Sequence, residues 1–338
     1  MLILYDKYKG ENIYGKKRLV WVDIAKAIAI ICMIVGHEVT NNTLRVFIFS
    51  FHMPLFFILS GYTSGYVDTW IKFGNKTKKQ FVKVWLLAVL MVILLGLENL
   101  LVGTFSLTKM IEADAQGIFW GSNMPWMKVQ TVAIMWFLFV FFWAKILFNG
   151  LQVVFQNKYN GAILGILAYF AFVISQKQWL PQAFDIVPIA ALFMWVGSFI
   201  KNFEKNTTSS NSIALSVLFV IIFCYWILCV QNGVTIEMAT RQYPLFIVSI
   251  LEAIAGTIMV CWISKGLAQK SFLVKSFQLI GQHTLAIMSI HQLDFYWINW
   301  ENYFNSWELA AISRLIVDLV LLFIWLRLCS YVRSLKSR

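Results

Sequence analysis

Long apolar runs alternate with short polar stretches along almost the whole chain. Each run is long enough to cross the roughly 30 Å hydrocarbon core of a bilayer as an α-helix. The pattern predicts ten membrane-spanning helices, at residues 20–38, 46–66, 84–102, 129–147, 159–174, 186–200, 213–230, 245–264, 277–296 and 309–326. We therefore expect an all-α, polytopic membrane protein.

The composition supports this architecture. Of the 338 residues, 60% are hydrophobic and 13% are charged, whereas charged residues make up about 25% of an average soluble domain. The mean hydropathy is +0.72. No internal repeat or appended soluble domain is evident, so we expect one membrane domain over residues 20–328, preceded by a cytoplasmic segment, 1–19, and followed by a basic cytoplasmic tail, 329–338.

The cysteines show neither metal-ligand nor disulfide spacing. They fall within apolar runs, where cysteine acts as a small hydrophobic side chain. We therefore expect no bound metal. The five positions are Cys32, Cys224, Cys229, Cys261 and Cys329.

The net charge of +12 reflects membrane topology rather than nucleic-acid binding. With ten helices and a cytoplasmic N-terminus, most of the 28 basic residues, Lys145 among them, fall on the cytoplasmic side. This asymmetry is what the positive-inside rule predicts, and it places both termini in the cytoplasm. Six basic residues fall on the outer side: Arg45, Lys109, Lys128, Lys177, Arg241 and Arg314.

The first predicted helix carries the densest set of ionisable residues. A charged group in hydrocarbon costs roughly 2.5–3.5 kcal/mol on insertion scales, so each one is a candidate for function. Asp23 and Lys26 are three residues apart and can pair on one helix face. Lys26 and His37 share a stripe, about 16 Å apart along the axis. The plainer interpretation is an interfacial ion pair, with His37 at the outer boundary of the membrane.

The second predicted helix returns a histidine to the depth of His37. His52 precedes the helix-bending Pro54, and Ser60 and Gly61 follow about two turns deeper. Small residues at that depth let helix backbones approach closely. The alternatives are a histidine that hydrogen-bonds a neighbouring helix and a plain packing motif.

The ninth predicted helix holds the other two histidines. His291 and Asp294 are three residues apart, so the carboxylate can orient the ring, as it does for many catalytic histidines. A structural His–Asp hydrogen bond is the alternative. His283 lies near the start of this helix, where a capping or interfacial role is expected. Three histidines from three helices would thus lie at one depth.

Several segments together resemble a known family. The first helix contains "DIAKAIAIICMIVGH", in which a basic residue precedes histidine by eleven positions, and the second contains "FHMPLFFILSGY". Weaker similarities are "MWFLFVFFWAK", "DIVPIAALFMWVGSFIK" and "IGQHTLAIMSIHQL". The chain resembles the acyltransferase-3 family of bacterial integral-membrane acyltransferases, and within it the fucose 4-O-acetylase branch. Many members carry arginine where this chain has Lys26, which keeps the charge but lacks the forked donor geometry.

The resemblance implies an enzyme of the bacterial plasma membrane that transfers an acyl group, most commonly acetyl from acetyl-CoA, to a hydroxyl of a surface or lipid-linked carbohydrate. It implies that His37 is the general base or acyl carrier, that Lys26 is the electrostatic stabiliser and that Asp23 orients Lys26. His52 would be a second catalytic or substrate-binding group. We further expect Ser60, His291 and Asp294 to contact substrate, and Arg18, Lys72, Lys76, Lys78 and Lys79 to hold the phosphates of CoA.

Two other functions fit parts of the pattern. A transporter or exporter of a polysaccharide or lipid-linked sugar would also use intramembrane histidines and acids, as a proton relay. Against a transporter, the sequence shows no evident inverted repeat and no matched pair of Gly- or Pro-broken helices in its two halves. A structural subunit of a surface-polymer synthase is the third possibility, and it predicts that all four histidines tolerate alanine. The basic cytoplasmic residues are equally consistent with ordinary positive-inside loops.

Overall fold

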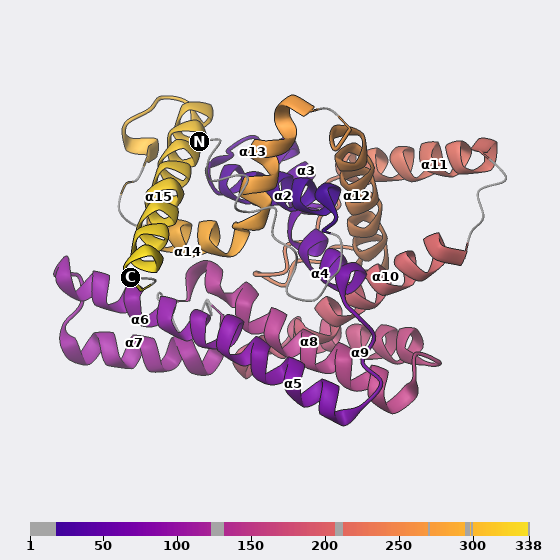
Figure 1. Cartoon of the computed structure of the whole chain (residues 1–338), viewed down its shortest axis with the longest axis horizontal. Coiled ribbons are helices and arrows are strands. Elements are labelled where there is room, and N and C mark those ends of the chain that lie inside the picture. Colours follow the sequence, from indigo (N-terminus) through magenta and orange to yellow (C-terminus); the bar gives the residue numbers. More distant parts are fainter. Residues whose placement is uncertain are drawn as a thin grey trace.

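The computed structural model describes residues 18–122, 132–206, 212–269, 271–294, 298 and 300–336. These residues form α-helices joined by loops and by short 3₁₀ or π-helical turns (Figure 1). Within this part of the chain, extended pairing is limited to one isolated antiparallel bridge, between Glu237 and Gln242. The predicted all-α fold is confirmed.

In chain order the α-helices are α2 (Val20–Glu38), α3 (Asn42–Phe49), α4 (His52–Thr63), α5 (Trp70–Gln80), α6 (Leu86–Leu101), α7 (Leu107–Trp120), α8 (Trp136–Phe155), α9 (Asn160–Ser175), α10 (Val187–Asn206), α11 (Ser212–Gln231), α12 (Phe246–Leu267), α13 (Ser271–Gln282), α14 (Thr284–Asp294) and α15 (Trp307–Lys336).

Seven helical stretches among the described residues are long and apolar enough to cross a membrane: Val20–Glu38, Asn42–Thr63, Trp70–Leu101, Ala133–Phe155, Pro181–Lys205, Phe246–Leu267 and Trp307–Val332. The chain is therefore a multi-pass membrane protein. The helices α9 and α11 are apolar but shorter. The structure thus identifies fewer long spans than the ten predicted, and the number ten remains a prediction.

Helix α2 lies at the centre of the bundle, in contact with α4, α12, α13 and α15 (Figure 1). Its buried residues include Ala25, Ala27 and Ala29, whose small side chains let neighbouring helices approach. The approach of α13 is very close, because a Cβ atom added to Gly281 would lie 1.7 Å from the Asp23 carbonyl oxygen. The helices from α5 to α9 lie together along one side of the molecule.

Helices α4 and α10 pack backbone to backbone. A Cβ atom on Gly61 of α4 would lie 1.7 Å from the carbonyl oxygen of Met194, and one on Gly197 of α10 would lie 1.8 Å from that of Ile58. The close small-residue contact predicted at Gly61 is therefore present. It fixes the height of His52 and Ser60 relative to α10.

The predicted second helix, 46–66, is two helices. The chain turns at Ser50 and Phe51, and Pro54 falls in the first turn of α4, where its missing N–H removes no helical hydrogen bond. The predicted polar turn before this helix is also shorter, since α3 already begins at Asn42 and is capped by the Asn41 side chain, which accepts from the Leu44 N–H.

Other predicted boundaries differ too. The predicted helix 277–296 is broken at His283 into α13 and α14, and residues 295–296 lie outside the described residues. The predicted loop around Lys72 is the helix α5, which continues through a π-helical turn into α6, and α7 was not predicted. The last helix continues to Lys336, through most of the predicted tail. Residues 1–17, Lys128 and the predicted start at residue 129 lie outside the described residues.

Three basic residues that the charge pattern assigned to the two sides of the membrane are buried in the bundle. Lys145, Arg241 and Arg314 have exposed fractions of 7%, 2% and 3%. Arg241 pairs with Asp185, and Arg314 pairs with Glu38 at 2.8 Å. The positive-inside rule assigned them to the faces of the membrane, because it counts charges along the chain and does not register polar partners inside the protein.

Candidate functional site

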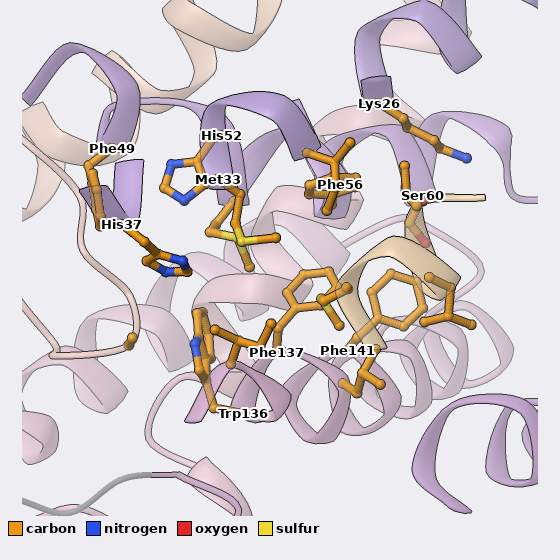
Figure 2. Close-up of a pocket in the computed structure, with 18 of the residues that line it drawn as sticks. Lys26, Met33, His37, Phe49, His52, Phe56, Ser60, Trp136, Phe137 and Phe141 are labelled. Carbon is orange, nitrogen blue, oxygen red and sulfur yellow. The ribbon is translucent and has the colours of Figure 1, made fainter. Parts of the chain in front are cut away.

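One cavity of about 410 Å³ joins four of the residues that the sequence singled out: Lys26, His37, His52 and Ser60. Lys26 and Ser60 line one end, and His37 and His52 line the opposite end (Figure 2). Lys26 and His37 are eleven positions apart on α2, which is about 16 Å at 1.5 Å per residue. We refer to these as the Lys26 end and the His37 end.

The wall between the two ends is apolar. It includes Met33 from α2, Phe56 from α4, and Phe137 and Phe141 from α8 (Figure 2). A narrow apolar passage between two polar ends suits a ligand that is itself apolar in its middle and polar at its ends.

At the His37 end, three side chains form a hydrogen-bonded chain. His37 Nδ1 lies 2.9 Å from His291 Nε2, and His291 Nδ1 lies 2.8 Å from Asp318 Oδ2. The two rings are nearly parallel, with 3° between their planes. His37 is in the last turn of α2, His291 is on α14 and Asp318 is on α15, so three helices hold the chain.

The hydrogen bonds among these three side chains determine which ring nitrogens carry protons when both histidines are neutral. The Asp318 carboxylate accepts from the Nδ1–H of His291, so His291 Nε2 is the acceptor nitrogen of that ring. His291 Nε2 then accepts from the Nδ1–H of His37. The remaining unprotonated nitrogen is Nε2 of His37, on a ring that lines the cavity. A lone pair there is the arrangement that a general base requires.

His52 is oriented by the break between α3 and α4. Its Nδ1–H donates to the carbonyl oxygen of Ile48 near the end of α3, at 2.9 Å, and the Phe51 N–H approaches the same oxygen at 3.4 Å. The ring therefore carries its lone pair on Nε2. Its edge also packs against Phe49, at 4.9 Å between ring centroids. His37 and His52 lie at the same end of one cavity, as their spacing in the sequence predicts.

The predicted pairing of His291 with Asp294 is wrong. Asp318, from another helix, takes the hydrogen bond, and Asp294 has no hydrogen-bond partner among the described residues. The ligand atoms of His291, Asp294 and Asp318 lie within 4.8 Å of one another, a spacing that a cation could bridge. The Arg314 side chain, one turn before Asp318, and the existing bond between Asp318 and His291 favour the hydrogen-bonded relay instead.

At the Lys26 end, the predicted pair of Asp23 and Lys26 is also replaced. Both carboxylate oxygens of Asp23 accept from Arg18, at 2.6 and 3.1 Å. Arg18, rather than Lys26, binds Asp23 because its guanidinium can donate two hydrogen bonds to one carboxylate and because it lies just before the first turn of α2. Lys26 donates no hydrogen bond to the described residues, and its side chain lines the cavity.

Lys145 is a functional candidate that the sequence analysis missed. Its ammonium donates to the carbonyl oxygen and the hydroxyl of Ser60, at 3.2 and 2.9 Å, and to the hydroxyl of Ser64. Among the described residues no carboxylate pairs with it. A buried ammonium with neutral partners alone is costly, so an anionic ligand would find an unneutralised charge one hydrogen bond away from the cavity. Its position in "MWFLFVFFWAK" was the available signal.

Two more lysines reach the same end of α4. Lys76 donates to the carbonyl oxygen of Gly65, at 2.7 Å, and Lys201 donates to that of Ser64, at 3.2 Å. Both of these contacts are to neutral carbonyl groups of the backbone. Lys76, Lys145 and Lys201 thus surround residues 60–65, next to Lys26 and Ser60. We call this group the lysine cluster.

The other predicted phosphate-binding residues lie around this group with differing partners. Lys72 pairs with Asp68 at 2.9 Å, and this contact lowers the pKa of the Asp68 carboxyl. Arg18 is held by Asp23. Lys78 and Lys79 are exposed on the last turn of α5. Lys72 and Arg18 are therefore largely neutralised by their carboxylate partners.

Trp136 brings a hydrogen-bond donor to the His37 end. It lines the cavity beside His37 (Figure 2), and its indole N–H makes no hydrogen bond with the described residues. The side chain of Gln292 holds the 3₁₀ turn before Trp136, since it accepts from the Ile134 N–H at 3.0 Å. Lys26, which the resemblance implies is the electrostatic stabiliser, lies at the opposite end of the cavity from His37, whereas Trp136 lies beside His37.

Comparison with protein families gives one finding that covers the whole site. The family model described as an acyltransferase domain, of the acyltransferase-3 type, matches residues 19–332, which include both ends of the cavity. Comparisons with curated proteins and with solved structures gave no significant match. Because the family model spans nearly the entire chain, the protein belongs to the acyltransferase-3 family.

Proposed function

We propose that this protein is a membrane-bound O-acyltransferase that moves an acetyl group from cytoplasmic acetyl-CoA to a hydroxyl of a cell-surface or lipid-linked sugar. The observation that carries the proposal is one cavity lined by Lys26 and Ser60 at one end, beside the lysine cluster, and by His37 of the His37–His291–Asp318 chain at the other. An enzyme with a cytoplasmic donor and an exported acceptor needs such a path, because polar substrates do not cross hydrocarbon unaided. We place it in the bacterial plasma membrane.

The residues of the Lys26 end fit an acyl-CoA donor. The phosphates of CoA are polyanionic, and Lys26 and the lysine cluster bring four cations to this end of the molecule. Lys145, the most buried of them, has no carboxylate partner among the described residues. Lys78 and Lys79 would add long-range attraction. The pantetheine arm of CoA is a narrow and largely apolar chain, which matches the passage lined by Met33 and Phe137.

At the His37 end, His37 Nε2 takes the proton of the acceptor hydroxyl as its oxygen attacks the thioester carbonyl. A C–O bond forms, the C–S bond breaks, and His37 returns the proton to the leaving thiolate, so the products are an ester and a thiol. His291 and Asp318 stabilise the transient positive charge on His37. The Trp136 N–H donates to the developing oxyanion. The same groups would serve a two-step route in which His37 carries the acetyl group.

The proposal predicts that His37→Ala abolishes acetyl transfer. The substitution removes the base from the cavity, and general-base catalysis contributes at least about 10²-fold. Purified protein in lipid nanodiscs is incubated with acetyl-CoA, and free CoA is measured with a thiol reagent. Wild-type protein releases CoA, and the variant falls to background.

His283→Ala is the matched control, because His283 lies between α13 and α14 and does not line the cavity. It should keep CoA release within about twofold of wild type, the range of a surface substitution. Release of CoA by His37→Ala at the wild-type rate would contradict the assignment. Absence of CoA release by the wild-type protein would favour the transporter alternative.

A further inference from the structure

The wall of the cavity at the His37 end is completed by a loop as well as by helices. Ile236, Glu237 and Ala239 line the cavity, and they belong to the connection between α11 and α12, residues 232–245. Arg45 and Phe49, from α3, line the cavity with them. A ligand that approaches His37 from this end therefore meets the connection on one side and α3 on the other.

The connection is held rigidly by a buried arginine. Arg241 Nε donates to Asp185 Oδ2 at 2.6 Å, and Arg241 Nη2 donates to the Ser122 hydroxyl at 3.2 Å. The guanidinium also stacks over the Trp179 ring, at 3.6 Å from its centroid. The bridge between Glu237 and Gln242 closes the loop above it. Glu237 is thus presented from a fixed support, as a recognition residue needs to be.

Arg45 and Glu237 meet across the mouth of the cavity. Arg45 Nη2 lies 3.2 Å from Glu237 Oε1, and the guanidinium lies over the Phe49 ring, 4.3 Å from its centroid. The side chains are 41% and 18% exposed. An ion pair with this exposure is weak, so a ligand can replace it. The buried pair between Arg241 and Asp185 just behind it, with exposed fractions of 1% and 0%, stays in place.

The chemistry of this mouth matches an uncharged sugar. A carboxylate accepts and a guanidinium donates hydrogen bonds, so together they can bind two adjacent hydroxyl groups. Phe49 and Trp136 supply aromatic faces beside them, for the apolar face of a pyranose ring. Glu237 disfavours a phosphate or carboxylate group at the same place. His37 and His52 lie just inside, where a third hydroxyl would react.

We propose that Arg45 and Glu237 form the acceptor-binding site: their ion pair closes the His37 end of the cavity and opens to bind vicinal hydroxyls of an uncharged sugar. This inference rests on the proposed O-acyltransferase function, and it adds the class of acceptor and the side chains that recognise it.

The test compares acetyl transfer with release of CoA in one assay. Membrane vesicles from cells of the source organism, which hold the natural acceptor, receive radiolabelled acetyl-CoA and purified enzyme in excess over the resident copy. Alkali-labile acetyl in the carbohydrate fraction and free CoA are both measured. Arg45→Glu and Glu237→Arg should each lower the amount of ester formed per CoA released by at least about tenfold, because a charged hydrogen-bonding partner of the acceptor is lost.

The double variant Arg45→Glu with Glu237→Arg separates recognition from simple closure. It restores an ion pair but exchanges donor and acceptor, so the ratio should stay low. A return to the wild-type ratio would overturn the recognition role and leave only a structural latch. Unchanged ratios in both single variants would overturn the site altogether.

Lys109→Glu is the matched control. Lys109 is an exposed cation over the Phe105 ring, at 4.7 Å, as Arg45 is over Phe49, but it does not line the cavity. It should leave both measurements at the wild-type level. If the wild-type enzyme itself releases no CoA and forms no ester, the proposed function fails, and that outcome is distinct from failure of the acceptor site.

Discussion

At the scale of single residues, one buried carboxylate decides which nitrogen of His37 is basic. Asp318 holds the proton of His291 on Nδ1, so His291 Nε2 accepts from the Nδ1–H of His37. The unprotonated nitrogen of His37 is then Nε2. An asparagine at position 318 keeps the shape but can turn its amide N–H toward His291. The rings would then adopt the opposite tautomers, and His37 would carry a proton where the mechanism needs a lone pair.

Asp318→Asn should therefore lower kcat for CoA release by about 10²-fold or more, with KM for acetyl-CoA within about twofold, because the donor binds at the other end of the cavity. Steady-state kinetics on the purified protein separate the two constants. Glu112→Gln, an exposed carboxylate on α7, is the control and should change neither. A rise in KM alone would show that Asp318 acts in donor binding and not through His37.

The histidines were predictable from the sequence, but their partners were not. His37, His52 and His291 are polar interruptions in apolar runs, and the spacing of His37 and His52 places them at one end of a hairpin. The partner of His291 could not be read from spacing. Asp294 is the nearer acid along the chain, yet Asp318 reaches the ring from α15, and such a contact depends on how two helices pack. Lys145 was missed for the same reason, since its partners lie on α4.

At the scale of helices, the contact between α4 and α10 positions the Lys26 end of the cavity. Gly61 and Gly197 let the two backbones touch, and the neighbouring Ser60 accepts from Lys145 on α8. A methyl group at either glycine has no space, because the nearest atoms belong to the rigid backbone of the other helix. The helices would have to separate, and dispersion contacts along the interface would be lost.

Gly61→Ala and Gly197→Ala should each lower the free energy of unfolding by about 1–3 kcal/mol, the usual cost of overpacking. Thermal unfolding of the purified protein in detergent measures the change. Gly165→Ala on α9 is the matched control, since nothing lies within 4 Å of its added Cβ atom. Alanine is the better helix former, so this variant should be as stable as the wild type or slightly more stable. Equal stability of all three variants would contradict the packing argument.

Helix existence was easier to predict than helix ends. The ranges for α2, α9, α11 and α12 agree with the structure within a few residues, because each is a single apolar run with polar flanks. The breaks after α3 and after α13 fall inside apolar runs. At these breaks the His52 side chain bonds the Ile48 carbonyl oxygen, and the His283 N–H bonds the Ile280 carbonyl oxygen three residues before it. Neither hydrogen bond can be predicted from hydropathy.

At the scale of the whole molecule, the two ends of the cavity differ in how their cations are partnered. At the Lys26 end, Lys76, Lys145 and Lys201 contact carbonyl and hydroxyl groups. At the His37 end, the arginines at 45, 241 and 314 each pair with a carboxylate. Lys145, which has no carboxylate partner among the described residues, therefore adds positive charge to the Lys26 end, the end that the positive-inside rule predicts to be cytoplasmic.

The number of crossings bears on the same orientation. The seven long spans alone are an odd number, which would put the ends of the described chain on opposite sides. The shorter apolar helices α9 and α11, with the broken pair of α13 and α14, would bring the number to the ten that the sequence predicts. An even number returns the chain to its starting side, and we propose that both ends are cytoplasmic.

Single cysteines at the two ends test this orientation, after the five native cysteines are replaced. Gly74 lies among the lysines of α5, and Asn232 begins the connection that holds Glu237; both are exposed. Asn232→Cys should react with a membrane-impermeant maleimide in intact spheroplasts, whereas Gly74→Cys should react only after permeabilisation. The cysteine-free parent controls for labelling of other proteins. The reverse pattern would place the lysine cluster outside, away from cytoplasmic acetyl-CoA, and the direction of transfer proposed for this cavity would be wrong.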